Sequence, residues 1–336
     1  MDSSKNYSLS LTNTRRDQAI KCLSVVLPAY NEARNLEVLL PLLITQLHGI
    51  AQNLELIVVD DGSKDDTLAA VQTLGRQGLP VRLIELSRNF GKEVALTAGL
   101  DHASGDVVVT MDSDGQHPLE VLPLMLEKWR AGFDVIYGVQ VDRRHSQPVL
   151  RRGLTKLFYR LMSAGTGLEI PSDAGDFRLL DRGAVDALKR LPERTRYMKG
   201  LFAWVGFRST PVPFVPGDRL HGETNFHYRK LFSLAVTGLT AFTQLPLRVV
   251  TAVGILISLA ALFYGLFIVV NTLFYGNPIS GYATIAASIM LFSGIQLLAL
   301  GVIAEYLGRV FDEVKHRPLY IVRDVWVADS SDRVNT

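Results

Sequence analysis

The sequence predicts a doubly wound α/β domain followed by two membrane-spanning helices, and three features carry this prediction. Short β-branched runs alternate with helical patterns between residue 22 and about residue 216. These runs are continuously apolar, as expected of parallel strands whose sheet is covered on both faces. Further along, the stretch from Val249 to Ala304 contains no Asp, Glu, Lys or Arg. Such a stretch is typical of helices that cross a bilayer.

The strands of the predicted domain are read from five apolar runs. Helical patterns separate these runs, and the first pattern has Glu32 and Asn35 near its start. A strand–helix series of this kind favours a sheet with helices on both faces. The expected strands are Leu23–Tyr30, Leu54–Ser63, Val81–Leu86, Asp106–Asp112 and Asp134–Val139.

The composition argues against several classes of function. The net charge of +2 over 336 residues gives no basic excess, so no nucleic-acid partner is expected. Neither GxGxxG nor GxxxxGK[ST] occurs, which disfavours dinucleotide and P-loop sites. The single cysteine, Cys22, has no partner for an intrachain disulfide, in keeping with a reducing compartment. Residues 1–21 lack the apolar core of a signal peptide, and we expect a flexible tail there.

Polar residues follow three of the predicted strands, in the runs PAYNE, DDGSKDDT and DSDGQ. In a doubly wound sheet, ligands bind beyond the carboxyl ends of the strands. Asp112 and Asp114 are one residue apart, so in an extended chain both carboxylates face one side and repel unless a cation lies between them. Such oxygen ligands suit Mg²⁺ or Mn²⁺. A solvated turn is the alternative, since Asp and Gly are common turn residues.

The uncharged stretch is interrupted once, at Tyr275–Tyr282, where Gly, Asn and Pro favour a turn. Each half has about 20–25 residues, enough to cross a hydrocarbon core of about 30 Å. We expect a two-helix transmembrane hairpin at 247–310, after a juxtamembrane amphipathic segment at 230–246; a buried helical hairpin is the alternative. Basic flanking residues place both hairpin ends in the cytoplasm, with 311–336 as a cytoplasmic tail. These residues are Arg248 before the uncharged stretch Val249–Ala304 and Arg309, Lys315 and Arg317 after it.

Several runs of the chain resemble a known family in order and spacing. PAYNE, VVDDGSKDDT, SRNFGKEVALTAGL and MDSDGQHP are similar to the GT-A (Rossmann-like) nucleotide-sugar-binding domain of glycosyltransferase family 2. After the hairpin, AEYLGRVFDEVKHRPLYIVRD is similar to polyprenyl-phosphate glycosyltransferases such as bactoprenol glucosyltransferases and dolichol-phosphate mannose synthase. The resemblance runs from Cys22 to Asp324 and places a GT-A catalytic domain at 22–229.

This resemblance implies a membrane-bound, inverting enzyme with Mg²⁺ or Mn²⁺ as cofactor. It would move a hexose, with glucose as first choice, from a UDP-sugar to undecaprenyl phosphate at the cytoplasmic face of the inner membrane. Membrane lipids would be further partners, and two-helix relatives tend to form homo-oligomers. A processive polysaccharide synthase is disfavoured because Ala203 precedes Trp204 where such enzymes usually carry Gln-x-x-Arg-Trp. A non-catalytic sugar-nucleotide-binding scaffold is disfavoured because Asp112, Asp114 and Gln116 are all present.

The resemblance also assigns a donor site residue by residue. The sequence departs from the family at Asn225, where many relatives carry a lysine, so any cation on the diphosphate would come from Arg229, Lys230 or elsewhere. The assigned residues are Pro28, Tyr30 and Glu32 for the base and ribose, Val59 and Asp61 for the base edge, Asp112, Ser113 and Asp114 for the DxD element, Asp112, Asp114 and Gln116 for the metal, and Arg219 for the diphosphate.

Catalytic and acceptor residues are assigned in the second half of the domain. SDAGDFRLLDR resembles the segment that carries the family's proposed catalytic aspartate, with Asp176 as first choice and Asp173 as second. A helix cap is the alternative for both. Basic side chains among apolar residues are candidates for the acceptor phosphate or the membrane surface, with a solvated helix face as the alternative. They are Arg143, Arg144, Arg151, Arg152, Lys156, Arg160, Arg194, Arg196 and Lys199.

Overall fold

The chain forms two compact units. The computed structural model describes Arg16 and residues 19–141, 174–194, 196–217, 245–275 and 281–328. One unit, which we call the sheet unit, comprises residues 1–159, 168–227 and 318–336. The other, the hairpin unit, comprises residues 160–167 and 228–317.

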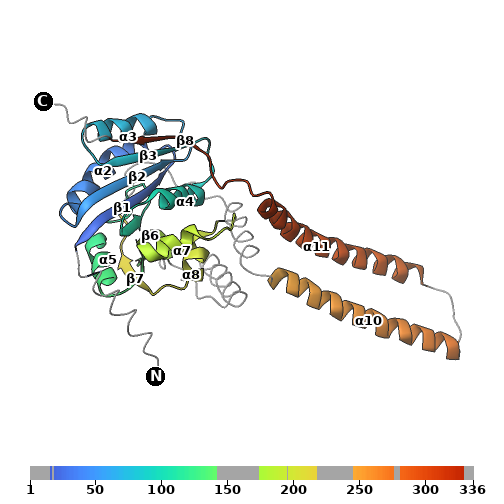
Figure 1. Ribbon diagram of the computed structural model, residues 1–336. Helices are drawn as coiled ribbons and strands as arrows, with labels where there is room; N and C mark the ends of the chain where they lie inside the picture. The colour runs from blue at the N-terminus through green and yellow to red at the C-terminus, as the bar shows by residue number, and fades with distance from the viewer. Residues whose placement is uncertain are drawn as a thin grey trace, which may run out of the picture. The chain divides into compact units, whose positions relative to one another are not determined.

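An eight-stranded sheet forms the centre of the sheet unit (Figure 1). Strands β1 to β4 run parallel where they pair, whereas β6 is antiparallel to β4 and β5, and β8 is antiparallel to β3. The strand order is β7-β5-β6-β4-β1-β2-β3-β8. The strands are β1 (Ile20–Ala29), β2 (Ala51–Asp60), β3 (Val81–Leu86), β4 (Val107–Thr110), β5 (Val135–Gln140), β6 (Ala174–Asp181), β7 (Ser209–Phe214) and β8 (Val322–Val327).

The sequence predicted the first five strands, and all five are confirmed with shifts of a few residues at their ends. It predicted neither β6, β7 nor β8. Two of these, β6 and β8, make the sheet mixed rather than parallel.

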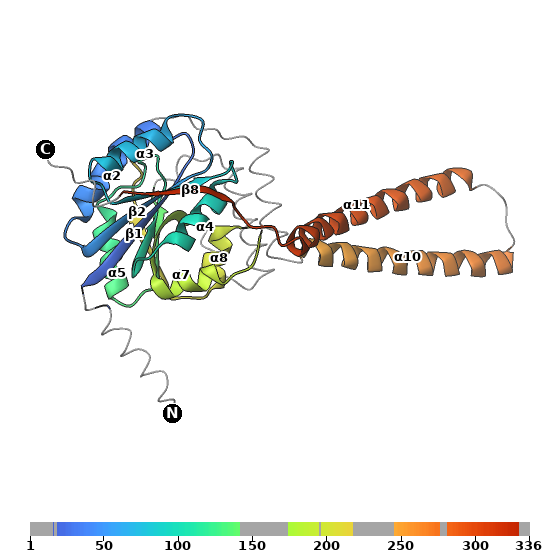
Figure 2. The same cartoon turned by 45° about the horizontal axis from the view of Figure 1, so that its top comes forward.

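Helices cover the sheet on both faces (Figure 2). Alternate residues of β1 point to opposite faces, as the pleat requires. Leu23, Val25 and Leu27 belong to the core beneath α2, α3 and α5. On the other face Val26 lies against α4 at Gly99, where a Cβ atom would be 2.2 Å from its Cγ1. The helices are α2 (Ala33–Leu47), α3 (Thr67–Arg76), α4 (Lys92–His102), α5 (Val121–Arg130), α7 (Arg182–Lys189) and α8 (Met198–Trp204).

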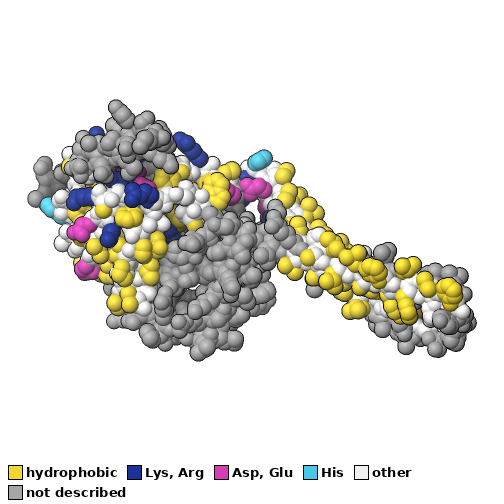
Figure 3. All heavy atoms as spheres, turned by 90° about the horizontal axis from the view of Figure 1, so that it is seen from below, with side chains coloured by type: hydrophobic (Ala, Val, Ile, Leu, Met, Phe, Trp, Pro, Cys, Tyr) yellow, Lys and Arg dark blue, Asp and Glu magenta, His cyan; other side chains and the backbone are white. Residues whose placement is uncertain are grey.

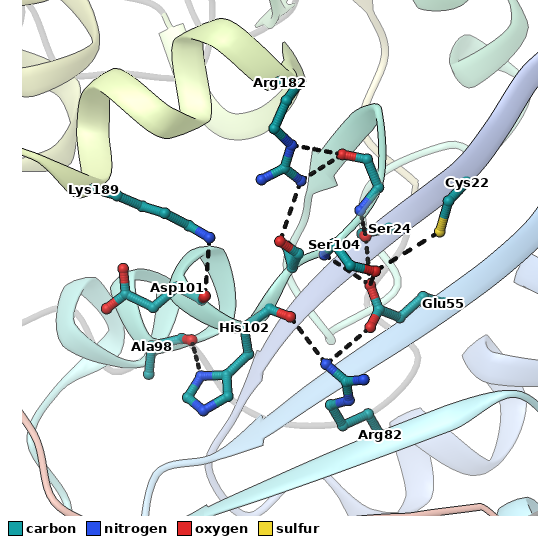
Figure 4. Close-up of polar contacts among 12 residues, drawn as sticks. Cys22, Ser24, Glu55, Arg82, Ala98, Asp101, His102, Ser104, Arg182 and Lys189 are labelled. Carbon is teal, nitrogen blue, oxygen red and sulfur yellow. Dashed lines mark hydrogen bonds and ion pairs between the residues drawn. The ribbon is translucent and has the colours of Figure 1, made fainter.

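Helix α4 is held at its C-terminal end by basic side chains from neighbouring elements (Figure 4). Arg82 donates to the carbonyl of His102 at 3.0 Å, and Lys189 donates to that of Asp101 at 2.9 Å. Arg182 reaches the carbonyl of Ala103 at 3.2 Å. Cations at this end of a helix satisfy its free carbonyls and complement its dipole. These contacts therefore fix the C-terminal end of α4, which lies at the opposite end of the sheet from its first residue.

Part of the expected N-terminal tail belongs to the folded sheet unit. Within the expected tail 1–21, β1 begins at Ile20 and Arg16 is buried. The Arg16 guanidinium donates to the carbonyls of Trp129 and Phe133 at 3.1 Å each and pairs with Asp134 at 2.5 Å. These contacts tie the segment before β1 to the end of α5.

The segment expected as a cytoplasmic tail, 311–336, contains a strand. Helix α11 continues to Val314, and β8 then pairs with β3 along its edge. The Trp326 ring packs over α3, where a Cβ atom at Gly75 would lie 2.4 Å from it. Without β8, strand β3 would present unpaired backbone groups at the edge of the sheet.

The hairpin unit contains two long helices, α10 (Leu245–Tyr275) and α11 (Tyr282–Val314), at the positions expected for the hairpin. Among the described residues one segment, Leu291–Val314, is long and apolar enough to cross a membrane by length and composition. Hydrophobic side chains run along the described parts of this unit (Figure 3). That α10 also spans the bilayer stays a prediction.

The first prediction concerns β8. Trp326→Ala should lower the free energy of unfolding of the full chain by about 2 kcal/mol, because it removes a partly buried aromatic ring from the core beneath α3. The measurement is urea unfolding in detergent, followed by circular dichroism. Val327→Ala is the control, because that neighbouring side chain is exposed and its loss should change the free energy by less than about 0.5 kcal/mol. Equal stability of both variants would show that β8 is not anchored through Trp326.

Candidate active site

The carboxyl ends of the strands bring the predicted acidic residues to one edge of the sheet. Strands β1, β2 and β4 are parallel, so the loops that follow Ala29, Asp60 and Thr110 leave from the same edge. Thr110 pairs with Arg178 of the antiparallel strand β6. Asp112 is two residues after Thr110 and Asp176 is two residues before Arg178, so both lie beyond this pair in the same direction.

A lysine ammonium lies between these two carboxylates. Lys92 Nζ is 2.6 Å from Asp112 Oδ1 and 2.6 Å from Asp176 Oδ2. Burial opposes ionisation of Asp176, but the attraction of Lys92 outweighs it and lowers the pKa of Asp176 to about 2. Burial likewise opposes the charge on Lys92, but the two carboxylates hold its pKa above the ordinary value. Asp176 and Lys92 are therefore charged together at neutral pH.

The sequence analysis missed Lys92 as a site residue. The signal was its position: it follows Gly91 in the loop after β3, so it leaves from the same edge as the aspartates and begins α4. Gly91 has φ +99°, a left-handed conformation that side chains rarely adopt. One oxygen of Asp176, Oδ1, is buried and has no hydrogen-bond partner among the described residues.

Asp61 holds the loop that precedes Lys92. Its Oδ1 accepts the backbone N–H of Phe90 at 2.7 Å, and its Oδ2 accepts that of Gly91 at 2.8 Å. Burial raises the pKa of Asp61, and these two hydrogen bonds act in the opposite direction. The next residue, Gly62, has φ +71°, and a Cβ atom there would lie 2.7 Å from the carbonyl carbon of Arg88. The residue assigned to the base edge thus also fixes the start of α4.

The DxD loop is a tight turn stabilised by its own polar groups. Asp114 Oδ1 accepts the backbone N–H of Gln116 at 3.1 Å, around Gly115 with φ +74°. The Ser113 hydroxyl donates to the carbonyl of Pro28 at 2.9 Å and so joins this loop to the end of β1. Asp112, Asp114 and Gln116, the proposed metal ligands, lie together in this turn.

His117 stabilises the DxD loop through a hydrogen bond to its backbone. Its Nδ1 accepts the backbone N–H of Asp112 at 3.1 Å, and its ring stacks on Phe177 with centroids 4.7 Å apart. Burial lowers the pKa of His117, so the ring is neutral and Nδ1 is free to accept. The sequence offered no spacing from which this supporting role was predictable.

Residues assigned to the nucleotide differ in how accessible they are. Tyr30 is 41% exposed at the end of β1, whereas the Val59 side chain is fully buried and packs against α4. Glu32 accepts a hydrogen bond from Asn35, and its backbone N–H donates to the Thr67 hydroxyl at 3.0 Å. Tyr30 therefore presents a ring to a ligand, whereas the Val59 side chain does not.

The helix-cap alternative for Asp176 is wrong. Asp176 lies inside strand β6, and its carbonyl accepts the Thr110 hydroxyl at 2.7 Å. The cap of α7 is Asp181, whose carboxylate accepts the Gly183 N–H at 2.9 Å. Asp176 is thus a strand residue whose carboxylate belongs to the site edge.

Several predicted residues lie outside the described part of the chain. They are Asp173, Arg219, Asn225, Arg229 and Lys230, and, of the basic candidates, Arg143, Arg144, Arg151, Arg152, Lys156 and Arg160. Of the described candidates, Lys199 in α8 lies close enough to lower the pKa of Asp176.

Two further charged residues adjoin Asp176, and the sequence analysis did not single them out. Arg178 is buried, with its guanidinium 4.2 Å from the centroid of the Phe202 ring. Glu93 accepts the backbone N–H of Met198 at 3.2 Å and so joins the first turn of α4 to α8. Burial and the nearby Asp176 raise the pKa of Glu93 to about 7.

The DxD residues fit a divalent cation only with ligands from elsewhere. Within the described ranges there is no group of three or more His, Cys, Asp and Glu side chains placed to hold a metal. Carboxylate and amide oxygens are nevertheless the donors that Mg²⁺ and Mn²⁺ prefer, and Asp112 already pairs with a cation through Oδ1. These residues fit an ion whose remaining ligands are supplied by a bound phosphate group or water.

A Rossmann-like α/β sheet with an acidic loop at its carboxyl edge is the architecture of GT-A glycosyltransferases. The family described as glycosyl transferase family 2 matches residues 24–189, and the GtrB C-terminal hairpin matches residues 245–310. An uncharacterized glycosyltransferase from Synechocystis sp. is 45% identical over 304 residues, which cover 90% of this chain and 95% of that protein. The chain belongs to glycosyltransferase family 2 and is a glycosyltransferase.

Other relatives carry more specific names. A bactoprenol glucosyl transferase from Shigella phage SfV is 39% identical over 302 residues, covering 90% of this chain and 98% of that protein. Among solved structures, glucosyl-3-phosphoglycerate synthase from Mycobacterium tuberculosis, crystallised with Mn²⁺, UDP and phosphoglyceric acid, has a TM-score of 0.49 and 24% identity, covering 69% of this chain and 80% of that one. The first of these similarities extends over both units of the chain.

The second prediction follows from Glu93. Its folded pKa of about 7 lies above the ordinary value of 4.5, so the folded state binds more protons than the unfolded state between these pH values. The Glu93 contribution to stability should therefore fall as the pH rises from about 4.5 through 7, by at most about 1.4 kcal/mol per pH unit. Urea unfolding of the wild type and Glu93→Gln at several pH values measures this slope. A difference between them that does not vary with pH would contradict the prediction.

Proposed function

We propose that this glycosyltransferase moves glucose from UDP-glucose to a polyprenyl phosphate such as undecaprenyl phosphate. The observation that carries the proposal is the edge where Asp112, Asp114 and Asp176 meet, in a chain that matches a bactoprenol glucosyl transferase over both units. The acidic turn suits a cation on the donor diphosphate, and Asp176 faces it from the neighbouring strand.

The donor would bind along the loops at the carboxyl ends of β1, β2 and β4. The Tyr30 ring is exposed and available to the nucleotide, and Pro28, Glu32 and Asp61 are the further proposed contacts. Asp112, Asp114 and Gln116 would hold Mg²⁺ or Mn²⁺, which when bound neutralises the charge on the leaving diphosphate. Arg219 is the proposed further contact to the diphosphate.

The transfer is a single displacement. An oxygen of the acceptor phosphate forms a bond to the anomeric carbon while the bond from that carbon to the diphosphate oxygen breaks, so the configuration inverts. The acceptor oxygen is already anionic near neutral pH, so no proton has to be removed from it. Asp176, with a pKa of about 2, is a poor base and suits a different role. We assign it to accept a hydrogen bond from a sugar hydroxyl through Oδ1, the oxygen that Lys92 does not bind.

The acceptor phosphate would lie on the basic side of Asp176. Lys199 is the described candidate that acts on Asp176, and Arg194 and Arg196 are also described. The other candidates lie outside the described residues, namely Arg143, Arg144, Arg151, Arg152, Lys156 and Arg160. Their charges would attract both the acceptor and anionic lipid headgroups.

A lipid acceptor stays in the bilayer, so the enzyme has to work at the membrane surface. We propose that α10 and α11 both span the inner membrane, since α10 has 31 residues and a length of about 46 Å. The charge distribution around the hairpin favours a cytoplasmic location for the sheet unit and for both termini. The domain boundaries proposed from the sequence then change at two places, because β1 begins at Ile20 and β8 joins the sheet unit.

The third prediction tests the reaction and its cation. Purified full-length protein in detergent should transfer glucose from UDP-glucose to undecaprenyl phosphate, in preference to other UDP- and GDP-sugars. EDTA should abolish the transfer, and Asp114→Asn should lower kcat by roughly a hundredfold or more, because a metal ligand is lost. Product formation is followed with radiolabelled sugar.

The control for this experiment is Asp186→Asn, which makes the same change at an exposed carboxylate in α7 and should retain full activity. Full transfer in EDTA would show that the reaction does not need a divalent cation. Transfer from no UDP-sugar, or only to acceptors without a lipid phosphate, would refute the proposed function.

The fourth prediction separates binding from chemistry at Asp176. Asp176→Asn keeps the size of the side chain but removes its charge, so kcat should fall about a hundredfold while KM for UDP-glucose stays within about threefold. Such a result is expected of an interaction made mainly in the transition state. Asp173→Asn is measured beside it. Near-normal turnover in Asp176→Asn together with an inactive Asp173→Asn would assign the role to Asp173.

A further inference from the structure

One group in the site has no part in the reaction as proposed so far, namely the Lys92 ammonium. It forms an ion pair with Asp112, a proposed metal ligand, at 2.6 Å. A divalent cation on Asp112 Oδ1 and the ammonium on the same oxygen would repel one another at this distance. The two cations therefore compete for Asp112.

The charges explain why a cation is needed there in the donor-free protein. Asp112 follows β4, Asp176 lies in the neighbouring strand β6, and both side chains bind Lys92 while being 30% and 17% exposed. Two carboxylates in such a partly desolvated position repel unless a positive charge lies between them. Lys92 supplies one positive charge. A divalent ion supplies two positive charges and brings with it the negative charge of the bound diphosphate.

The backbone of Lys92 is fixed but its side chain is able to move. Asp61 binds the two N–H groups directly before it, and Arg82, Lys189 and Arg182 hold the far end of α4. The Lys92 side chain is 45% exposed, so the ammonium has room to leave Asp112 by rotation. Asp176, which already binds the ammonium at 2.6 Å, would be its partner after such a rotation.

We propose that Lys92 is a positioning residue that occupies Asp112 in the donor-free enzyme and makes divalent-cation binding depend on the donor diphosphate. The proposal rests on the metal role of Asp112 in the proposed function. Without a nucleotide, the cation has to displace the ammonium with few ligands in return. With the diphosphate present, its oxygens complete the ligand set, and the ammonium moves to Asp176 alone.

The experiment measures Mn²⁺ binding directly, without turnover. Full-length protein in detergent is titrated with Mn²⁺ alone and with Mn²⁺ plus UDP, and free Mn²⁺ is read by electron paramagnetic resonance. The wild type should bind Mn²⁺ much more weakly without UDP than with it. Lys92→Met should tighten Mn²⁺ binding without UDP by about tenfold or more, because the competing charge is gone. The UDP dependence of Mn²⁺ binding should shrink accordingly.

Matched variants distinguish the ammonium from other effects. Lys92→Arg keeps the charge and should behave like the wild type. Lys21→Met removes one positive charge at the exposed start of β1 and should leave Mn²⁺ binding unchanged. Lys92→Gln is the second neutral variant and should match Lys92→Met, which keeps the test valid if one of the two folds poorly.

Three results would overturn the inference. Neutral variants that bind Mn²⁺ no more tightly than the wild type would show that Lys92 does not compete for Asp112. A wild type that binds Mn²⁺ equally well with and without UDP would show that there is nothing for Lys92 to control. In either case the proposed function stands if transfer still needs the metal. Absence of Mn²⁺ binding even with UDP, together with transfer in EDTA, would instead refute the metal role itself.

Discussion

The ion pairs of Lys92 with Asp112 and Asp176 are the interactions on which the site depends. Asp112 follows β4, Asp176 lies in β6 and Lys92 begins α4, so three separate elements converge on one ammonium. Each element is held for this purpose by other polar contacts. His117 fixes the backbone of Asp112, Thr110 fixes that of Asp176, and the Asp61 carboxylate fixes the loop before Lys92.

Helix α4 connects this edge of the sheet to the opposite one. Its first residue is Lys92. At its other end, the Asp101 carbonyl accepts a hydrogen bond from Lys189, and the Asp101 carboxylate accepts one from the Tyr320 hydroxyl at 2.9 Å. Tyr320 belongs to the segment that leads from α11 to β8. The chain therefore returns from the hairpin and completes the sheet beside the helix that carries the central cation. In this arrangement β8 is a structural part of the glycosyltransferase domain.

Much of this arrangement was predictable because it follows from local patterns in the sequence. The apolar runs of β1 to β5 are long and β-branched, and the turn residues after them identify the edge that carries the site. Strand β6 was missed because polar residues such as Asp176 and Arg178 interrupt it, and its pairing with β4 is a tertiary property. Strand β8 follows a membrane-type helix and is mostly exposed, so its pattern resembles a tail. Lys92 was missed because its role arises from tertiary contacts of the first residue of α4 with Asp112 and Asp176.

The central claim is that a single ammonium holds Asp112 to Asp176 until the donor arrives. Experimental structures of the full chain, free and with Mn²⁺ and UDP-glucose bound, test it through the distance from Lys92 Nζ to Asp112 Oδ1. The account predicts a close ion pair in the free protein, near the 2.6 Å found here. With the ligands bound, that distance should exceed about 4 Å, the usual limit of an ion pair, while Lys92 stays on Asp176. A Lys92–Asp112 pair that persists in the loaded enzyme would contradict the account.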